Sequence, residues 1–544
     1  MKLPRLVLVV VSLLVLVPVP AAQALEKWFY QSTNLLVDKN IDELETLWKR
    51  AAAAGYTQVL LADSKFGRLK DMEGTRYGEN VARVKRIAAD LHLEIVPAVF
   101  PIGYSSDLLS QDVNLVEALP VKDVPLIIQG GMAQLDDPTA PRFPAEGFQN
   151  LKAWDFRDEA MAPEEGGILH VSGQGGNARI FKKLKVQPWR QYRVSVRIKT
   201  ADFKGEPEIK VLAGQDKEAH DIQWAKLGTE RTQDWQVHHV VFNSQEFTEV
   251  NLALGVWGYN GGDLWWSDPA LEEVAFLNLV RRLGAPVTIK TADDGKVVDP
   301  QLYEPLADEK LGTTPWKGEY DVVHEPRALR GKFPDGTRLL ASYYHAGIVM
   351  NNQAAICLSE PKTYELLRDQ AQRMHALWGA KGYMMSHDEI RVMNWCEACQ
   401  ARHLTPGQLL ADNVKRCTAL LREVNPGGRI YVWSDMFDPN HNAVADPYYL
   451  VNGPITGSWE GLDKDVIVIP WYLDKAAKSL KFFAERGHRQ ILAGYYDSTP
   501  LNAIPWLTAA QPVSTSIQGI MYTTWERDYS QLEKFSQEID QGSR

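Results

Sequence analysis

Residues 382–391 read GYMMSHDEIR, a short apolar run followed by a cluster of charged side chains. The run from Gly382 to Ser386 is typical of a buried β-strand, and Asp388 and Glu389 come directly after it. Apolar strands that alternate with helices indicate a parallel sheet covered by helices. In closed barrels of this kind, catalytic groups stand at the carboxyl ends of the strands. The stretch therefore predicts a barrel strand that carries two catalytic carboxyls.

The same alternation recurs on both sides of this strand. Nine apolar runs are candidate strands: 28–36, 57–62, 93–100, 338–344, 382–386, 429–433, 465–470, 489–495 and 519–524. Helical patterns separate most of them. Eight strands close a (β/α)8 TIM barrel of the mixed α/β class, which leaves one strand as the stem of an insertion. An open doubly wound sheet is the alternative, but no Gly-rich phosphate loop follows any of the strands.

The helical pattern is interrupted in the middle of the chain. Residues 148–274 show strict apolar–polar alternation with Gly, Asn and Asp between the runs, which is typical of an antiparallel β-sandwich. We therefore predict the first part of the barrel at 25–120 and an inserted sandwich at 148–274. The second part of the barrel, with the catalytic site, is predicted at 330–540.

The N-terminus has the layout of a secretory signal peptide. Lys2 and Arg5 precede an apolar run over residues 6–17, and Ala22-Gln23-Ala24 provides a small-residue cleavage site. We expect residues 1–24 to be removed and the protein to be secreted or periplasmic; an uncleaved anchor is the alternative. No later segment is long and apolar enough to predict a membrane span.

Composition narrows the class of protein. Lys plus Arg number 59 against 69 Asp plus Glu, and this net charge of −10 argues against a nucleic-acid partner. The 17 tryptophans either fill a large core or stack on a flat ligand such as a sugar ring. The chain has no Walker loop, no G-x-S-x-G and no H-E-x-x-H, which argues against nucleotide, serine-hydrolase and zinc-protease chemistry.

Acidic and aromatic residues gather at the predicted strand ends, and this combination predicts an oligo- or polysaccharide substrate. Carboxylates act as acid, base or nucleophile on a glycosidic bond, and aromatic rings stack on the sugar. The candidate substrate-binding residues are Tyr344, His345, His387, Arg391, Trp433, Asp435, Trp459, Glu460, Trp471, Tyr495, Trp525 and Glu526.

Asp388 and Glu389 are the candidate catalytic residues. Two adjacent carboxylates repel each other, which raises the pKa of one of them, and a Glu with a raised pKa is a suitable general acid. The alternative is that both are acids at a helix N-terminus, facing the helix dipole.

The stretch MMSHDEIR resembles the strand-four motif of the glycoside hydrolase family 20 β-hexosaminidases. The resemblance implies substrate-assisted, retaining hydrolysis of β-linked N-acetylhexosamine, with Glu389 as the acid/base and Asp388 orienting the acetamido group. The later order VWSDM, IVIPW, ILAGYY and MYTTWE is also similar. It implies that Trp433, Trp471 and Trp525 wall the pocket and that Glu526 binds sugar hydroxyls.

This sequence departs from the family pattern at Ser386 and His387, which stand where the family has glycine before Asp-Glu. Without acetamido assistance, Glu389 would pair with Asp435 or Glu526 across the barrel, and the carboxyl separation would decide between retaining and inverting chemistry.

The inserted segment resembles the jelly-roll carbohydrate-binding modules. The stretches that carry this likeness are VQPWRQYRVSVRIKT and GVWGYNGGDLWWSDPALEEV. It implies a structural calcium ion in the sandwich and sugar-binding aromatics among Trp257, Tyr259, Trp265 and Trp266, some of which belong to the core if they alternate. No cofactor is expected in the barrel.

The four cysteines leave three alternatives open: a zinc site, a disulfide or free thiols. Cys396 and Cys399 have C-x-x-C spacing, and a zinc site that adds His403 and Cys417 is conceivable. A local disulfide or buried free thiols is favoured over this site.

Two functions of different classes follow. An exported family-20-like glycosidase predicts that Glu389 reaches a deep pocket walled by tryptophan. A non-catalytic glycan-binding protein on a degenerate barrel predicts a shallow mouth, with Asp388 and Glu389 held in salt bridges to Arg391 or other basic groups. The oligomeric state, the sugar and the linkage are not determined by the sequence.

Overall fold

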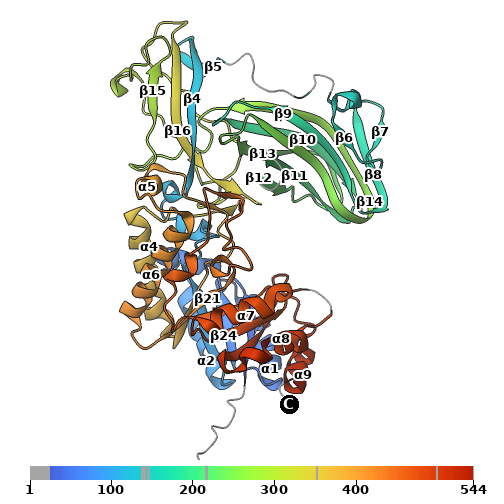
Figure 1. Ribbon diagram of the computed structural model, residues 1–544, viewed down its shortest axis with the longest axis vertical. Coiled ribbons are helices and arrows are strands. Elements are labelled where there is room, and N and C mark those ends of the chain that lie inside the picture. The colour runs from blue at the N-terminus through green and yellow to red at the C-terminus, as the bar shows by residue number, and fades with distance from the viewer. Residues whose placement is uncertain are drawn as a thin grey trace, which may run out of the picture.

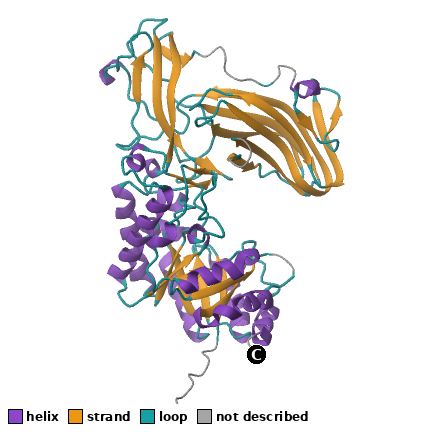
Figure 2. Cartoon of the chain, in the orientation of Figure 1, coloured by secondary structure: helices purple, strands orange, loops and turns teal. Residues whose placement is uncertain are grey.

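The computed structural model describes residues 25–136, 143, 147–214, 219–350, 353–497 and 500–542. The predicted signal peptide, residues 1–24, lies outside the described residues. The chain forms a barrel covered by helices and two antiparallel sheets that lie beyond one end of it (Figures 1 and 2). Across the described ranges, no helix has the length and apolar character needed to cross a membrane.

Eight parallel strands close the barrel, as the sequence predicted. Its first and last strands pair with each other, with Trp28 opposite Met521. Around the barrel the strands are β1 (Glu26–Ser32), β2 (Gln58–Ala62), β3 (Glu94–Val99), β19 (Gly382–Met385), β21 (Arg429–Trp433), β23 (Ile467–Ile469), β24 (Gln490–Tyr495) and β25 (Ile517–Thr523).

The ninth predicted strand lies outside the barrel. It is β16 (Arg338–Ala346), which pairs with antiparallel neighbours in a separate sheet. The placement of Tyr344 and His345 at a barrel strand end is therefore wrong. A short run of apolar residues predicts a buried strand but does not say which sheet it joins.

Helices cover the barrel at most steps of the repeat (Figure 1). They are α1 (Asp38–Ala53), α2 (Tyr77–Asp90), α4 (Pro361–Trp378), α6 (Pro406–Val424), α7 (Ala476–Glu485), α8 (Ala503–Ala510) and α9 (Leu532–Gly542). The start of α6 is specified locally, because Pro406 occupies its first turn and Thr405 forms a capping box with Gln408.

One step of the repeat has no α-helix. Between β21 and β23 the chain instead forms the 3₁₀ turns η8 (Asp435–Phe437) and η9 (Ser458–Gly461) and the short strand β22 (Leu450–Val451). Three prolines and two glycines over residues 439–457 disfavour a helix there. The barrel departs from a complete strand–helix repeat at this step.

The inserted chain leaves after β3 and returns before α4, so it is attached at the carboxyl end of the barrel. One part of it, which the sequence analysis did not predict, is a four-stranded antiparallel sheet with its own apolar core. Its strands, in spatial order, are β15 (Thr288–Thr291), β16, β4 (Ala118–Gln129) and β5 (Met132–Leu135).

The other part is a nine-stranded antiparallel sheet that curves strongly (Figure 1). Its strands are β6 (Phe156–Arg157), β7 (Ala162–Glu164), β8 (Ile168–Gly175), β9 (Ala178–Lys185), β10 (Gln191–Ala201), β11 (Gly205–Ala213), β12 (His220–Lys226), β13 (Gln233–Asn243) and β14 (Glu249–Val274). The first half of β14 pairs with β9 and β11, and the second half pairs with β8 and β10. This arrangement is consistent with the predicted β-sandwich.

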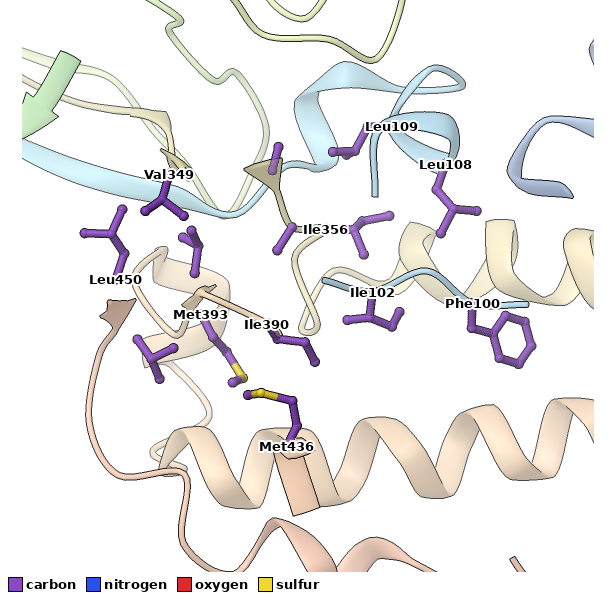
Figure 3. Packing of buried hydrophobic residues seen from close by; sticks show 14 of the residues in the cluster. Phe100, Ile102, Leu108, Leu109, Val349, Ile356, Ile390, Met393, Met436 and Leu450 are labelled. Carbon is purple, nitrogen blue, oxygen red and sulfur yellow. The ribbon is translucent and has the colours of Figure 1, made fainter. Parts of the chain in front are cut away.

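The connections at the carboxyl end of the barrel pack on one another. Figure 3 shows Ile102, which follows β3, near Ile356 from the returning chain and Ile390 from the connection after β19. Met393 in β20 (Val392–Met393) and Met436 in η8 extend the cluster. All five side chains are buried, so apolar packing ties the insertion to this end of the barrel.

The barrel interior depends on large side chains, and Trp28 is fully buried there with its ring 5.1 Å from that of Tyr431. We expect Trp28→Ala to lower the free energy of unfolding by about 3–5 kcal/mol, because the cavity cannot collapse inside a closed barrel. Denaturant unfolding measures the change. Trp316→Ala, at a position 73% exposed, is the matched control and should cost at most about 0.5 kcal/mol. Equal effects of the two variants would contradict the assigned core.

Candidate functional site

A pocket of about 450 Å³ lies at the carboxyl ends of the barrel strands. Each of the eight strands contributes a residue at or just after its end. These residues are Tyr30, Ala62, Val99, Asp388, Trp433, Trp471, Tyr496 and Trp525. The strand-end rule, that functional groups of such barrels stand at the carboxyl ends of the strands, therefore predicted the location of the pocket. Closing a parallel barrel brings all these ends together.

Aromatic rings form one wall of the pocket. Trp471 and Tyr496 stack with their centroids 5.2 Å apart, and Trp433 meets the edge of Trp525 at 5.8 Å. Tyr30 lies 4.9 Å from Trp525 on the neighbouring side. Trp525 is 41% exposed, so part of its ring is open to solvent. Such a wall suits a ligand with a flat, partly apolar face.

The backbone at Asp388 and Glu389 is tightly constrained. Glu389 has a φ of 46°, in the left-handed region that non-glycine residues rarely adopt, and its N–H donates to Asp435 Oδ2 at 2.8 Å. Gly103 packs against this turn, and a Cβ there would lie 2.1 Å from the Asp388 carbonyl oxygen. The close approach requires glycine at position 103 and fixes where the two carboxyls point.

Both oxygens of the Glu389 carboxylate have partners. Arg391 Nη2 lies 2.7 Å from Oε1, and the Tyr104 hydroxyl donates to Oε2. Arg391 is itself held by Gln353, whose Oε1 accepts from its Nη1, and Gln353 Nε2 donates to the Glu389 carbonyl oxygen at 2.8 Å. Gln353 therefore connects the Glu389 backbone to the guanidinium that pairs with its side chain.

Two other carboxyls at the site resist ionisation. Burial, followed by the charge of Glu389, raises the pKa of Asp388 to about 7. Burial, followed by the charge of Asp388, raises the pKa of Asp435 to about 8. The sequence analysis expected one raised carboxyl in the adjacent pair and favoured the Glu for it. In the structure the raised pKa of this pair belongs to Asp388, and its main cause is burial.

Asp435 supports the site from behind the pocket surface. It is fully buried, and besides the Glu389 N–H it accepts from Asn442 Nδ2 at 3.0 Å and from Trp471 Nε1 at 3.4 Å. One carboxyl therefore connects the turn at Asp388 and Glu389 to the aromatic wall, and we treat Asp435 as a positioning residue.

The structure brings together some of the predicted site residues. Those that line the pocket are Asp388, Glu389, Trp433, Trp471 and Trp525. His387, by contrast, is fully buried with Nε2 3.0 Å from Asn413 Oδ1, and burial lowers its pKa to about 4.

Nine predicted residues do not line the pocket. Three of them, His387, Arg391 and Asp435, lie behind its surface as described above, and the other six are Tyr344, His345, Trp459, Glu460, Tyr495 and Glu526. His345 is buried 3.0 Å from Asn243 of β13. Trp459 packs on Phe482, and the Tyr495 hydroxyl donates to Asp528. A position near a strand end does not settle the direction of a side chain, which is why these residues were included.

The sequence analysis missed several lining residues, among them Asp63, Tyr104, Asp107, Gln370 and Tyr496. Asp63 directly follows β2 and Tyr496 follows β24, so the strand-end rule could have found both. No sequence signal marks Tyr104, because its contact with Glu389 joins residues 285 positions apart.

Comparison with known proteins gives no family. No protein-family model matches the chain, and no curated protein matches it. Among solved structures, a β-N-acetylhexosaminidase from Bacteroides fragilis is 13% identical, with 35% of this chain and 42% of that chain covered at a TM-score of 0.25.

Two further solved structures are similar to this chain over a part of its length. The pneumococcal exo-β-D-N-acetylglucosaminidase with tandem GH20 modules is 11% identical, over 35% of this chain and 51% of that chain, with a TM-score of 0.21. A family 16 carbohydrate-binding module is 18% identical, over 21% and 82%, with a TM-score of 0.18. The chain thus spans about half or less of each glycosidase. All three TM-scores are below 0.5, so the functional conclusion rests on the residues of the pocket.

Asp435→Asn should change how stability depends on pH. The folded pKa of Asp435, about 8, lies above its ordinary value near 4, so the folded state binds the extra proton between these pH values. This contribution to the free energy of unfolding is present at low pH and is lost as pH rises toward 8. Asp435→Asn lacks this contribution. We therefore expect the difference in the free energy of unfolding between wild type and the variant to shrink by a few kcal/mol from pH 5 to pH 8.

Denaturant unfolding at a series of pH values measures this change. Asp474→Asn, at an exposed position in η10 (Leu473–Lys475), is the control and should show no such trend. If the difference in the free energy of unfolding between wild type and Asp435→Asn stays constant across the series, Asp435 is ionised throughout.

Proposed function

We propose that this protein is a glycoside hydrolase on a TIM-type (β/α)8 barrel and that its pocket binds one sugar ring. The observation that carries the proposal is the pair Asp388 and Glu389, two adjacent carboxyls in different environments on a pocket walled by tryptophan. One carboxyl of such a pair supplies the acid and base that glycosidic cleavage needs, the other orients the substrate, and the tryptophans supply a face for the ring.

The roles follow the resemblance to family 20. Glu389 gives a proton to the glycosidic oxygen as the bond from that oxygen to the anomeric carbon breaks. The carbonyl oxygen of the substrate's own acetamido group attacks the anomeric carbon, while the Asp388 carboxylate accepts a hydrogen bond from the acetamido N–H. Glu389 then removes a proton from the water that opens this intermediate. A bound substrate must first displace Arg391 and Tyr104, which occupy both oxygens of the Glu389 carboxyl.

The proposal also covers the function of the insertion and the cellular location of the protein. We propose that the curved sheet is a jelly-roll carbohydrate-binding module with a structural calcium ion, and that the protein is exported. Trp257 and Trp265 are the half-buried candidates for sugar contact, whereas Trp266 is fully buried and Tyr259 is only 8% exposed. His170 stacks on Trp265 at 4.7 Å, which leaves at most the other face of that ring for a sugar.

A non-catalytic glycan-binding protein is the second candidate. The ion pair between Glu389 and Arg391, together with the Tyr104 hydrogen bond, favours it, because a carboxylate with both oxygens occupied is not poised to donate a proton. This candidate predicts the same ring-binding pocket without hydrolysis.

Hydrolysis of aryl glycosides tests the first candidate. We expect the mature chain to cleave an N-acetylglucosaminide or N-acetylgalactosaminide, and Glu389→Gln to lower kcat by about 100-fold or more through loss of the acid/base. Glu485→Gln, exposed near the end of α7, is the matched control and should retain activity. Glucoside and galactoside in the same panel report whether the acetamido group is required.

The outcomes separate the two candidates. Cleavage only of sugars without the acetamido group would keep the hydrolase and remove the substrate-assisted step. No cleavage, combined with calorimetric binding of a sugar that Trp525→Ala abolishes, would identify a binding protein.

The pH profile tests the role of Asp388. If its carboxylate accepts from the acetamido N–H, kcat/KM should rise with pH through about 7, the pKa of this group in the free protein. Asp388→Asn should lower the rate and remove that rise. A rate that instead falls through pH 7, with the fall absent in Asp388→Asn, would make Asp388 the proton donor.

A further inference from the structure

Four buried side chains converge outside the pocket. They are Glu117, Cys357, Cys396 and Cys399, and their nearest ligand atoms all lie within 4.8 Å of one another. Cys357 Sγ is 3.5 Å from Cys396 Sγ and 3.6 Å from Cys399 Sγ. Glu117 Oε2 is 3.5 Å from Cys399 Sγ and 3.8 Å from Cys396 Sγ.

These distances are the edges of a small tetrahedron. Four ligands around one zinc ion, with bonds of about 2.3 Å to sulfur, stand about 3.8 Å apart. Thiolate ligands select zinc over hard cations such as calcium or magnesium, and four protein ligands with no open position are typical of structural sites. We propose that Glu117, Cys357, Cys396 and Cys399 bind a structural zinc ion.

Glu117 is oriented to present a single oxygen. Its Oε1 accepts the backbone N–H groups of Trp395 at 2.7 Å and Cys396 at 3.0 Å. Its Oε2 faces the thiols instead. Hydrogen bonds of this kind, made by the atoms around a ligand, fix its orientation toward the metal.

The negative charge that Glu117 brings into the buried cluster supports a bound cation there. Glu117 is 1% exposed, and the nearest partners of its Oε2 are thiols, which are weak donors. A carboxylate buried in this way is costly without a counter-charge. The guanidinium of Arg282 interacts electrostatically with Cys357, Cys396 and Glu117, but it also forms an ion pair with Glu360 at 2.9 Å. Four anionic ligands and one zinc ion leave two negative charges, which a neighbouring guanidinium partly offsets.

The four ligands come from three segments of the chain. Glu117 stands where the chain leaves the barrel for the insertion, directly before β4. Cys357 stands where the chain returns, and the two crossings pair through the Glu117 N–H to Ala355 O bond at 2.7 Å. Cys396 is the N-cap of the short helix α5 (Glu397–Gln400) and Cys399 lies within it, in the connection between β19 and α6. The zinc ion would thus fasten both ends of the insertion to the barrel.

This set corrects the zinc ligands considered from the sequence. Cys417 lies in α6 with its thiol 3.9 Å from Asn413, and His403 lies outside the cluster. The C-x-x-C pair was recognised, but its partners come from positions 279 and 39 residues away from Cys396. The four cysteines are free in the structure, and a disulfide between any two of the clustered three would leave an unpaired third thiol.

Metal content of the full-length mature chain tests the site directly. The protein is expressed without a histidine tag in zinc-supplemented medium, purified without chelator, and measured by plasma mass spectrometry. We expect one zinc ion per chain. X-ray absorption at the zinc edge should show three sulfur ligands and one oxygen.

Variants locate the ion. Cys357→Ser and Cys399→Ser should reduce bound zinc to background and lower Tm, whereas Cys417→Ser, which removes an equally buried thiol outside the cluster, should retain one zinc ion. If the ligand variants do not fold, the zinc content and the X-ray absorption of the wild-type protein still test the site. Wild-type protein without stoichiometric zinc, or with a disulfide among these cysteines by intact mass, would overturn the proposal. Retention of zinc in Cys399→Ser would overturn the assigned ligands.

Discussion

Closure of the barrel is the constraint on which the rest of the structure depends. When β25 pairs with β1, the carboxyl ends of eight strands that are dispersed over almost 500 residues meet around one pocket. No single strand carries the site, because all eight strands, with the residues that follow them, contribute to its lining. The large rings inside, such as Trp28 and Tyr431, fill the closed cylinder, so the site rests on a rigid base.

Asp435 connects the residues of the candidate site to one another. It accepts from the backbone N–H of Glu389, which has a left-handed conformation, and also from the indole of Trp471, so one buried carboxyl contacts both the carboxyl pair and the aromatic wall. Burial, together with the charge of neighbouring carboxyls, raises the pKa of Asp388 to about 7 and that of Asp435 to about 8, while Arg391 pairs with Glu389 at 2.7 Å. Burial and neighbouring charge thus raise the pKa of two of the three acids that lie together.

The insertion is joined to this end of the barrel by apolar packing and by polar contacts that reach the site. Gln353, from the returning chain, orients Arg391, and Trp224 of the curved sheet stacks on Tyr449, whose ring lies 5.1 Å from the guanidinium of Arg391. The insertion therefore contributes to the surroundings of Glu389 and does not only sit beside the barrel. The cluster at Glu117 and Cys357 lies where the two crossings of the chain pair.

The sequence by itself determined the barrel strands, the antiparallel segment at 148–274 and the carboxyl pair, because hydrophobic period and strand-end position are local properties. It could not determine that β16 joins another sheet, that Tyr104 and Arg391 occupy Glu389, or that Glu117 and Cys357 complete the C-x-x-C cluster. Apart from the ion pair of Glu389 with its neighbour Arg391, which the sequence offered only as one alternative, these features depend on contacts between residues far apart in the chain. Only the tertiary structure decided them, because pairing, burial and charge at each site are set by whichever distant side chains the fold brings within a few ångströms.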